Sequence, residues 1–198
     1  MPTTDVDFDT VSRAIHARRT HKAFTGAAVD RATVELILEN ARWAPNHRLS
    51  QPWRFHALDQ AAIRRLMAFL VATPGIAAVP DPAKGSAKLA KLLDRLPSAG
   101  ALVQVTWVRA SDPRIDLEDH AAVAAAIQNA LLAATALGIA TYWSTSAALV
   151  HPDTLRWCGV DTATQGAIGC IWLGHAKEVP PIPPRRGLNE VLYWVEGT

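Results

Sequence analysis

The chain has 198 residues, of which 49% are hydrophobic and 19% are charged, with a formal net charge of +2 and a pI near 8.7. This length and composition predict a single globular domain, residues 1–198, that is large enough to enclose a core. The charge is far below that of a nucleic-acid-binding domain and no run of five Lys or Arg residues occurs, so we expect no nucleic-acid partner.

Two further readings of composition concern membranes and cysteines. Residues 121–150 carry no charged residue or histidine, but they are rich in alanine and are divided by Gly138. We interpret them as a buried helix followed by a buried strand, with no membrane span. Cys158 and Cys170 form neither a metal motif nor a disulfide framework, and we expect both to be buried. The first five residues lack the features of a signal peptide, so the cytoplasm is the expected location.

The N-terminal part of the chain predicts two helices. Asp9 or Thr10 can cap the first, and Arg18 and Arg19 would lie in its last turn. Asp30 can cap the second, because apolar residues follow it at i, i+3, i+4 and i+7 spacing.

Residues 53–58 then predict a strand, and Asp59 can cap a third helix. Residues 71–100 change character, with proline and glycine turn signals and a short basic helix expected at 86–96. Two interpretations of this region stay open: a solvated helix, or a mobile cover over a site.

The longest predicted helix is residues 116–137, which Gly138 would end. Its residues 121–127 are small and apolar on all sides, which predicts burial on all sides and, in a chain this short, cover by a second subunit. The order of helices and strands predicts the α+β class, with a mixed central sheet flanked by helices. The other expected elements are strands at 101–108, 139–145, 166–173 and 191–195, a helix at 152–158 and an extended proline-rich stretch at 180–184, within a C-terminal arm of residues 180–198.

Several well-known sites are absent from the sequence. It has no G-x-G-x-x-G or Walker A loop, so a dinucleotide would not be held in the Rossmann manner. It has no H-E-x-x-H motif or Cys/His cluster and no G-x-S-x-G elbow, which leaves metal sites and hydrolase chemistry without support.

Cations gather where the first helix should give way to a loop. Arg18, Arg19 and Lys22 could bind a phosphate, or they could complement the helix dipole. Thr20 could donate to a phosphate or ribityl oxygen, or it could cap the next turn.

Two further polar groups flank predicted strands. Residues 46–51 could be a capped connection or a binding loop, and the Gln51 amide could satisfy both the donor and the acceptor edge of a planar heterocycle. Trp143 could belong to the core, whereas Ser144 and Thr145 at a strand's end are well placed for a ligand.

Four segments, in the right order, resemble the nitroreductase family. Residues 18–24 match its N-terminal Arg-Arg/His-Ser/Thr segment, and residues 44–55 match its Ala-Pro…Gln-Pro-Trp-x-Phe segment. Residues 125–141 are similar to its central helix and following strand, and residues 169–174 to its late strand ending in glycine. The resemblance covers residues 10–195 and is greatest to short bacterial members.

The resemblance implies an intertwined homodimer that binds FMN at the subunit interface. Arg18, Arg19 and Thr20 would contact phosphate and ribityl, and Lys22 would lie near the pyrimidine side, where positive charge favours the reduced ring. His47 and Gln51 would contact FMN from one subunit. Trp143, Ser144 and Thr145 would contact it from the other subunit. The resemblance also implies a late phosphate contact from Gly174 and Arg186.

The activity implied is electron transfer from NAD(P)H to a nitroaromatic, a quinone or a related small electrophile by a ping-pong mechanism. The chemistry would take place at flavin N5, so no catalytic side chain is expected. Two alternatives stay open: a flavin-binding or storage dimer without enzyme activity, and a specialised reaction on the same fold, such as dehalogenation or flavin fragmentation.

Overall fold

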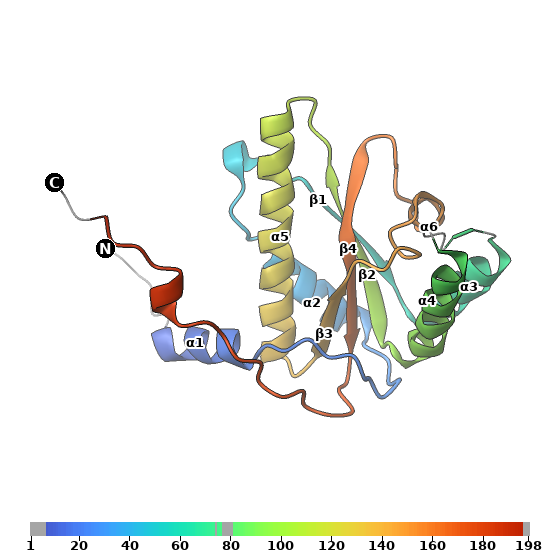
Figure 1. Cartoon of the computed structure of the whole chain (residues 1–198), viewed down its shortest axis with the longest axis horizontal. Coiled ribbons are helices and arrows are strands. Elements are labelled where there is room, and N and C mark those ends of the chain that lie inside the picture. The colour runs from blue at the N-terminus through green and yellow to red at the C-terminus, as the bar shows by residue number, and fades with distance from the viewer. Residues whose placement is uncertain (1–6, 74, 77–80, 196–198) are drawn as a thin grey trace.

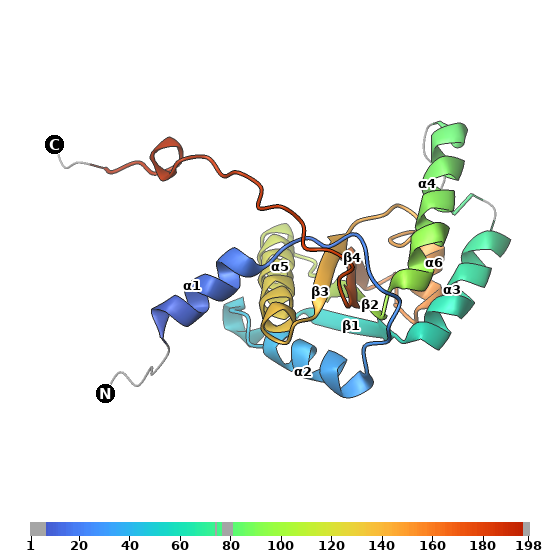
Figure 2. The same cartoon turned by 90° about the horizontal axis from the view of Figure 1, so that it is seen from below.

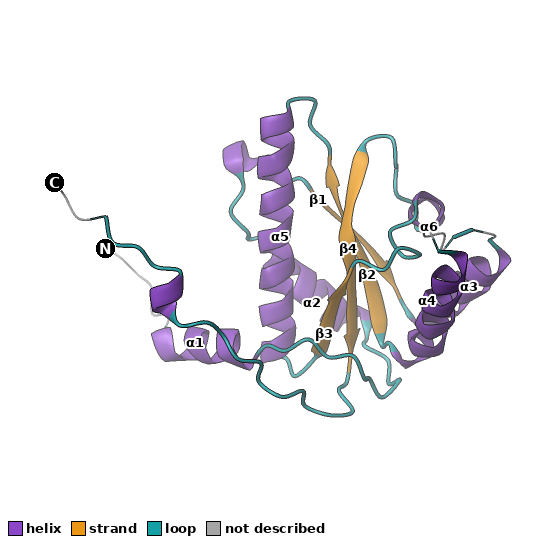
Figure 3. Cartoon of the chain, viewed as in Figure 1, coloured by secondary structure: helices purple, strands orange, loops and turns teal. Residues whose placement is uncertain are grey.

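A computed structural model of the chain describes residues 7–73, 75–76 and 81–195. Its centre is a four-stranded sheet with helices on both faces (Figures 1 and 3). This arrangement confirms the predicted α+β class. The turn signals predicted at Pro74 and at 79–80, and the last three residues of the predicted arm, lie outside the described residues.

The sheet has the strand order β1-β2-β4-β3. All three ladders between named strands are antiparallel, and within the described residues the sole parallel pair is an isolated bridge between Thr20 and Thr141. The apolar strand predicted to be central is β2, which pairs on both sides. A bulge between Val105 and Thr106 shifts the β2–β4 register. The strands are β1 (Trp53–Leu58), β2 (Ala101–Val108), β3 (Ala140–Ser144) and β4 (Gln165–Gly174).

Helices α2 (Arg31–Ala41) and α5 (Pro113–Ala136) cover one face of the sheet. Val123, Ile127 and Ala130 of α5 are buried against strand residues of that face. Helices α3 (Gln60–Ala72) and α4 (Pro82–Arg95) cover the other face together with α6 (Pro152–Trp157), and they bury a second core around Trp172. The sheet thus separates two cores, as in a three-layer packing.

Aspartates begin most of the helices, because a carboxylate can accept from the free N–H groups of the first turn. Asp30 and Asp59 cap α2 and α3, as predicted. Asp7 caps α1 (Phe8–Ala17), so the prediction of Asp9 or Thr10 was wrong by two or three residues. Helices α4 and α5 also begin earlier than predicted, because an aspartate followed by proline starts each: Asp81–Pro82 and Asp112–Pro113.

One other prediction needs correction. The strand expected at 191–195 does not form within this chain; a short 3-10 turn (Leu188–Glu190) precedes an irregular stretch. In the single chain α5 is buried on one face, while Ala121 and Gln128 are exposed, so the expected cover by a second subunit stays a prediction. Within the described residues, no helix is long and apolar enough to cross a membrane.

Helix α1 and the described part of the C-terminal arm, residues 180–195, extend away from the body on the same side (Figure 2). No residue of α1 is buried, and its apolar residues Phe8, Val11 and Ile15 are 79%, 42% and 48% exposed. Trp194 of the arm is 82% exposed. An amphipathic helix with its apolar side uncovered calls for a further partner surface.

Candidate functional site

Residues 18–24, the edge segment, run along the outer side of β3. Thr20 forms the parallel bridge with Thr141, and the His21 N–H donates to the Thr141 carbonyl at 2.8 Å. Phe24 bridges Ala176 beyond the end of β4. Main-chain bonds therefore bring the polar residues 18–22 beside β3, which leads into residues 143–145.

The two arginines stand at the end of α1. Arg18 is its C-cap residue, and Arg19 Nη1 donates to the carbonyls of His16 and Arg18 at 2.6 and 2.8 Å. The helix-end interpretation is therefore confirmed for Arg19. Both arginines also line a hollow of about 130 Å³, the arm hollow, with Thr20, Arg185 and three prolines of the arm. The described charged residues that line this hollow are all arginines, which donate hydrogen bonds, and such a lining suits a phosphate.

His21 and Lys22 continue the edge segment. Burial lowers the pKa of His21; a hydrogen bond with the Glu178 backbone opposes this, and the nearby charges of Arg18 and Arg19 lower it further. These effects favour the neutral imidazole, and among the described residues its buried Nδ1 has no hydrogen-bond partner. Lys22 Nζ lies 5.9 Å from the centre of the Tyr142 ring.

Trp143, Ser144 and Thr145 end β3 in three different environments. Ser144 is buried and its hydroxyl accepts from the Ser146 N–H at 3.3 Å, whereas Thr145 is exposed. The Trp143 indole donates to the Ile168 carbonyl at 3.2 Å and lies over Gly169. Gly169 has φ = 142°, and a Cβ there would come within 2.5 Å of the indole nitrogen. Glycine is therefore required for this placement of Trp143.

The late residues of the predicted site have different positions. Gly174 ends β4 in a buried place, where an added Cβ would lie 2.8 Å from Phe24. This close packing explains the glycine without a ligand, and its phosphate contact stays a prediction. Arg186 is exposed on the arm; its neighbour Arg185 is the one that lines the arm hollow.

The loop of residues 46–51 is held by the N-terminal part of α5. His47 Nδ1 lies 2.6 Å from Glu118 Oε2, and Ser50 Oγ donates to Asp119 Oδ1 at 2.6 Å. The His47 hydrogen bond is the main cause that lowers the pKa of Glu118. Within the loop, the Gln51 N–H donates to the Asn46 side-chain oxygen at 2.9 Å.

This loop has an unusual backbone. Arg48, Leu49 and Gln51 have φ values of 54°, 54° and 44°, in the left-handed region that non-glycine residues seldom adopt. Such conformations persist where the surroundings hold them, and they concentrate at ligand sites.

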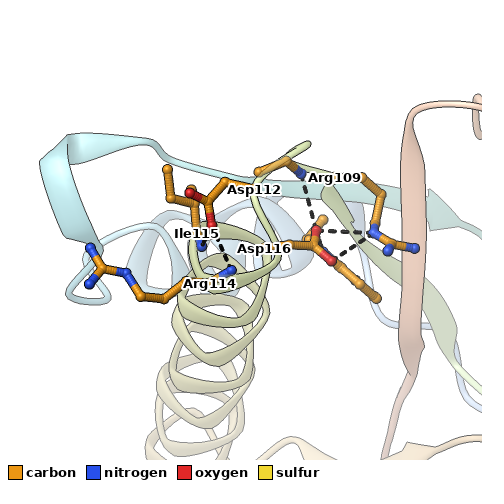
Figure 4. A network of polar contacts seen from close by, with 7 residues as sticks. Arg109, Asp112, Arg114, Ile115 and Asp116 are labelled. Carbon is orange, nitrogen blue, oxygen red and sulfur yellow. Dashed lines mark hydrogen bonds and ion pairs between the residues drawn. The ribbon is translucent and has the colours of Figure 1, made fainter.

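A second carboxylate network fixes the same end of α5 (Figure 4). Asp116 accepts from Arg109, from the Ala110 N–H at 3.1 Å and from the Trp107 indole at 2.9 Å. Burial acts to raise the pKa of Asp116, but these hydrogen bonds outweigh it and lower the pKa. Asp112 caps the helix one turn earlier. The end of α5 that holds the 46–51 loop is therefore itself fixed to the end of β2 and the residues that follow it.

One chain does not bring the loop and the edge segment together. Glu118 lies near the start of α5, and Ala136, at the other end, leads into β3 and its edge segment. These two helix positions are about 27 Å apart at 1.5 Å per residue. His47 and Gln51 are therefore far from Arg18 and Lys22 along the helix, and a site that uses both groups needs a second copy.

Several residues of these regions were not found from sequence. Arg185 had no signal to distinguish it from Arg186. Glu118 and Asp119 carry no sequence signal for this role, because only the fold shows which loop lies against them. Gly169 was noted for the late strand, but its support of Trp143 depends on strand register.

Comparisons with known proteins agree with this architecture. The sequence model of the nitroreductase family matches residues 15–175. YfhC of Bacillus subtilis (strain 168), provisionally named an NAD(P)H nitroreductase, is 26% identical over 176 residues, or 89% of each chain.

Solved structures give the same result. A nitroreductase-like family protein from Bacillus cereus aligns over 100% of both chains with a TM-score of 0.83 and 24% identity. A protein from Desulfovibrio desulfuricans, provisionally called a nitroreductase and solved in complex with FMN, has a TM-score of 0.73 and 26% identity over 95% of this chain and 98% of its own. With most of its length matched by the family model, the chain belongs to the nitroreductase family.

Proposed function

We propose that the protein is an FMN-dependent oxidoreductase that takes electrons from NAD(P)H and passes them to a small electrophilic acceptor, such as a nitroaromatic or a quinone. The observation that carries this proposal is the junction of the edge segment with β3. Along the edge segment, Arg18 and Thr20 line the arm hollow, and Lys22 follows further along the same segment, beside Tyr142. Family membership and the FMN complex of the Desulfovibrio desulfuricans relative support the choice of cofactor.

The residues present fit FMN. Arg18, Arg19 and Arg185 around the arm hollow could hold the phosphate, with the Thr20 hydroxyl as a further donor. The ammonium group of Lys22 would stand beside the pyrimidine edge, where positive charge favours electron uptake. When bound, FMN supplies the hydride-accepting atom; the protein supplies position and charge.

The second half of the proposed site would come from another copy of this chain. His47 and Gln51 of the partner would meet Trp143, Ser144 and Thr145 of this subunit. Two observations support a homodimer. The apolar side of α1 and the arm are uncovered in one chain, and the loop with His47 lies at the far end of α5 from Lys22. Burial of exposed apolar area is the dominant driving force for such an association.

Absorption spectroscopy tests this proposal. The purified protein should show a bound-flavin spectrum that bleaches when NADPH is added without oxygen and recovers when a nitroaromatic follows. Flavin that never bleaches would favour a storage dimer, and a protein that takes up no FMN would overturn the site.

Substitutions test the assigned residues. Arg18→Gln and Gln51→Ala should each weaken FMN retention, whereas Arg31→Gln, at an exposed ion pair of α2, should not. If both site variants retained FMN like the unmodified protein, the assignment of these two residues would be wrong. Light scattering should give a dimer mass, and Phe8→Asp should shift it toward the monomer.

A further inference from the structure

Helix α4 forms one wall of a hollow of about 410 Å³, the α4 hollow, on the face of the sheet opposite α5. Lys88, Lys91 and Arg95 stand on that wall. The facing wall carries hydroxyls at the end of β3 and the side chain of Tyr142. The hydroxyl residues are Ser144, Thr145 and Ser146.

The three cations share one side of α4. They are spaced at i, i+3 and i+7, which places them in one row, about 10 Å long at 1.5 Å per residue. Among the described residues, no Asp or Glu lines this hollow, and none of the three cations forms an ion pair. Lys84 of the same helix differs, because its ammonium lies 3.4 Å from Asp81 and it does not line the hollow.

Arg95 is fixed in place by its neighbours. Its guanidinium carbon lies 5.2 Å from the centre of the Tyr142 ring and 5.3 Å from that of Trp172, and Nη2 donates to the Lys22 carbonyl at 3.3 Å. This last bond joins α4 to the edge segment. The cations of the α4 hollow therefore stand next to the end of the proposed FMN site that holds Lys22.

FMN does not need these cations for its phosphate. In the proposed site its phosphate has the arm hollow, with Arg18, Arg19 and Arg185. The row on α4 is additional positive charge beside the α4 hollow, and a row of this length suits two phosphate groups better than one.

We propose that Lys88, Lys91 and Arg95 bind the phosphate groups of the nicotinamide donor, and that NADPH is therefore preferred over NADH. This inference rests on the proposed function and specifies its electron donor as NADPH. The 2′-phosphate of NADPH adds about 1.5 to 2 negative charges at neutral pH, as other phosphomonoesters do. The pyrophosphate of a dinucleotide carries about two negative charges, so one of the three cations would lack a counter-charge with NADH, whereas with NADPH the 2′-phosphate supplies it.

Binding of the oxidised dinucleotides tests this without any reaction. In calorimetric titrations of the FMN-loaded protein, NADP⁺ should bind about tenfold more tightly than NAD⁺, and added salt should reduce this preference. The double variant Lys88→Gln/Lys91→Gln should bring the two affinities to within about twofold of each other. Lys84→Gln, which removes the same charge from the same helix outside the hollow, should keep the preference.

A neutral donor separates this inference from the proposed function. With 1-benzyl-1,4-dihydronicotinamide, which has no phosphate, the flavin should bleach equally fast in the unmodified protein and in the double variant. With NADPH the double variant should show a KM raised about tenfold and an unchanged kcat. Absence of bleaching with every donor would count against the proposed function alone. Equal affinity for NADP⁺ and NAD⁺ in the unmodified protein, or an unchanged preference in the double variant, would overturn the inference.

Discussion

The two halves of the proposed site are built in different ways. The edge segment is fixed by main-chain bonds, through the Thr20–Thr141 bridge and the His21 N–H to Thr141 bond. The 46–51 loop is fixed by side chains, since His47 and Ser50 each contact a carboxylate of α5. Its backbone is also the less favourable one, with three non-glycine residues at positive φ.

This difference implies different sensitivities. Main-chain bonds survive most substitutions, so the edge segment should change only where packing is disturbed. The loop should respond to single side-chain changes and to pH, because its contacts depend on charged groups.

Gly169→Ala should produce the largest loss, on the β3 side. The new Cβ would meet the Trp143 indole and the Ser144 carbonyl, at a φ that alanine rarely adopts. Strain and overpacking together should lower the free energy of unfolding by about 3 kcal/mol. Urea denaturation measures this loss. Gly159→Ala is the matched control, because φ is 80° but no atom lies within 4 Å, so it should lose only about 1 kcal/mol.

Asp116→Ala should weaken the support of the loop. It leaves the Trp107 indole N–H and the Ala110 N–H without their acceptor. Two partly buried donors left without an acceptor should together lower the free energy of unfolding by about 2 kcal/mol. Urea or thermal unfolding measures this loss of free energy. A loss below about 0.5 kcal/mol, as for an ordinary surface substitution, would show that the Asp116 network does not anchor α5.

Asp119→Ala should affect the loop more than the rest of the fold. Asp119 is 7% exposed and accepts from Ser50 Oγ. We expect a loss of about 1 kcal/mol in unfolding free energy and a rise of about tenfold in the Kd for FMN.

The control for this change is a double-mutant cycle with Ser50→Ala. If the two residues act through their hydrogen bond, the coupling should be about 1 kcal/mol. Additive effects on FMN binding would mean that Asp119 does not position the loop.

The contact between His47 and Glu118 should give the smallest effect, and one that depends on pH. The pKa of Glu118 is lowered in the folded protein, mainly by its hydrogen bond with His47. The stability that the charged carboxylate contributes is therefore present above the ordinary glutamate pKa of 4.5, and it is lost as the pH falls through the pKa of Glu118 in the folded protein. Glu118→Gln should therefore weaken FMN binding slightly at pH 7. The difference from the unmodified protein should narrow below pH 4.5. Titrations followed by FMN fluorescence at pH 7 and at a pH below 4.5 measure this difference in FMN binding. An equal difference at the two pH values would mean that the charge of Glu118 does not support the loop.

Much of the fold could be predicted from the sequence. The strand at Trp53–Leu58 and the caps Asp30 and Asp59 matched the structure, because alternation and capping are local properties. Errors arose where two signals competed. The first helix has several aspartate and threonine candidates in a row, and Asp7 takes the cap; α4 begins at Asp81–Pro82 inside a stretch that reads as turns.

The residues of the candidate site were predicted only as separate groups. The sequence places cations at 18–22 and hydroxyls at 144–145, but nothing local says that Thr20 pairs with Thr141. That contact joins residues more than 100 positions apart and depends on how the edge segment returns to the sheet. The carboxylates that hold the 46–51 loop were missed for the same reason.

Periodicity, helix caps and short motifs were enough to predict the fold class, the order of most elements and the family. Which polar groups meet became visible only after the chain had folded. It paired Thr20 with Thr141, brought Arg185 to Arg18, and aligned Lys88, Lys91 and Arg95 beside one hollow. Electrostatic and hydrogen-bonding contacts act over a few ångströms in space, and chain position does not encode that distance until the helices pack on the sheet.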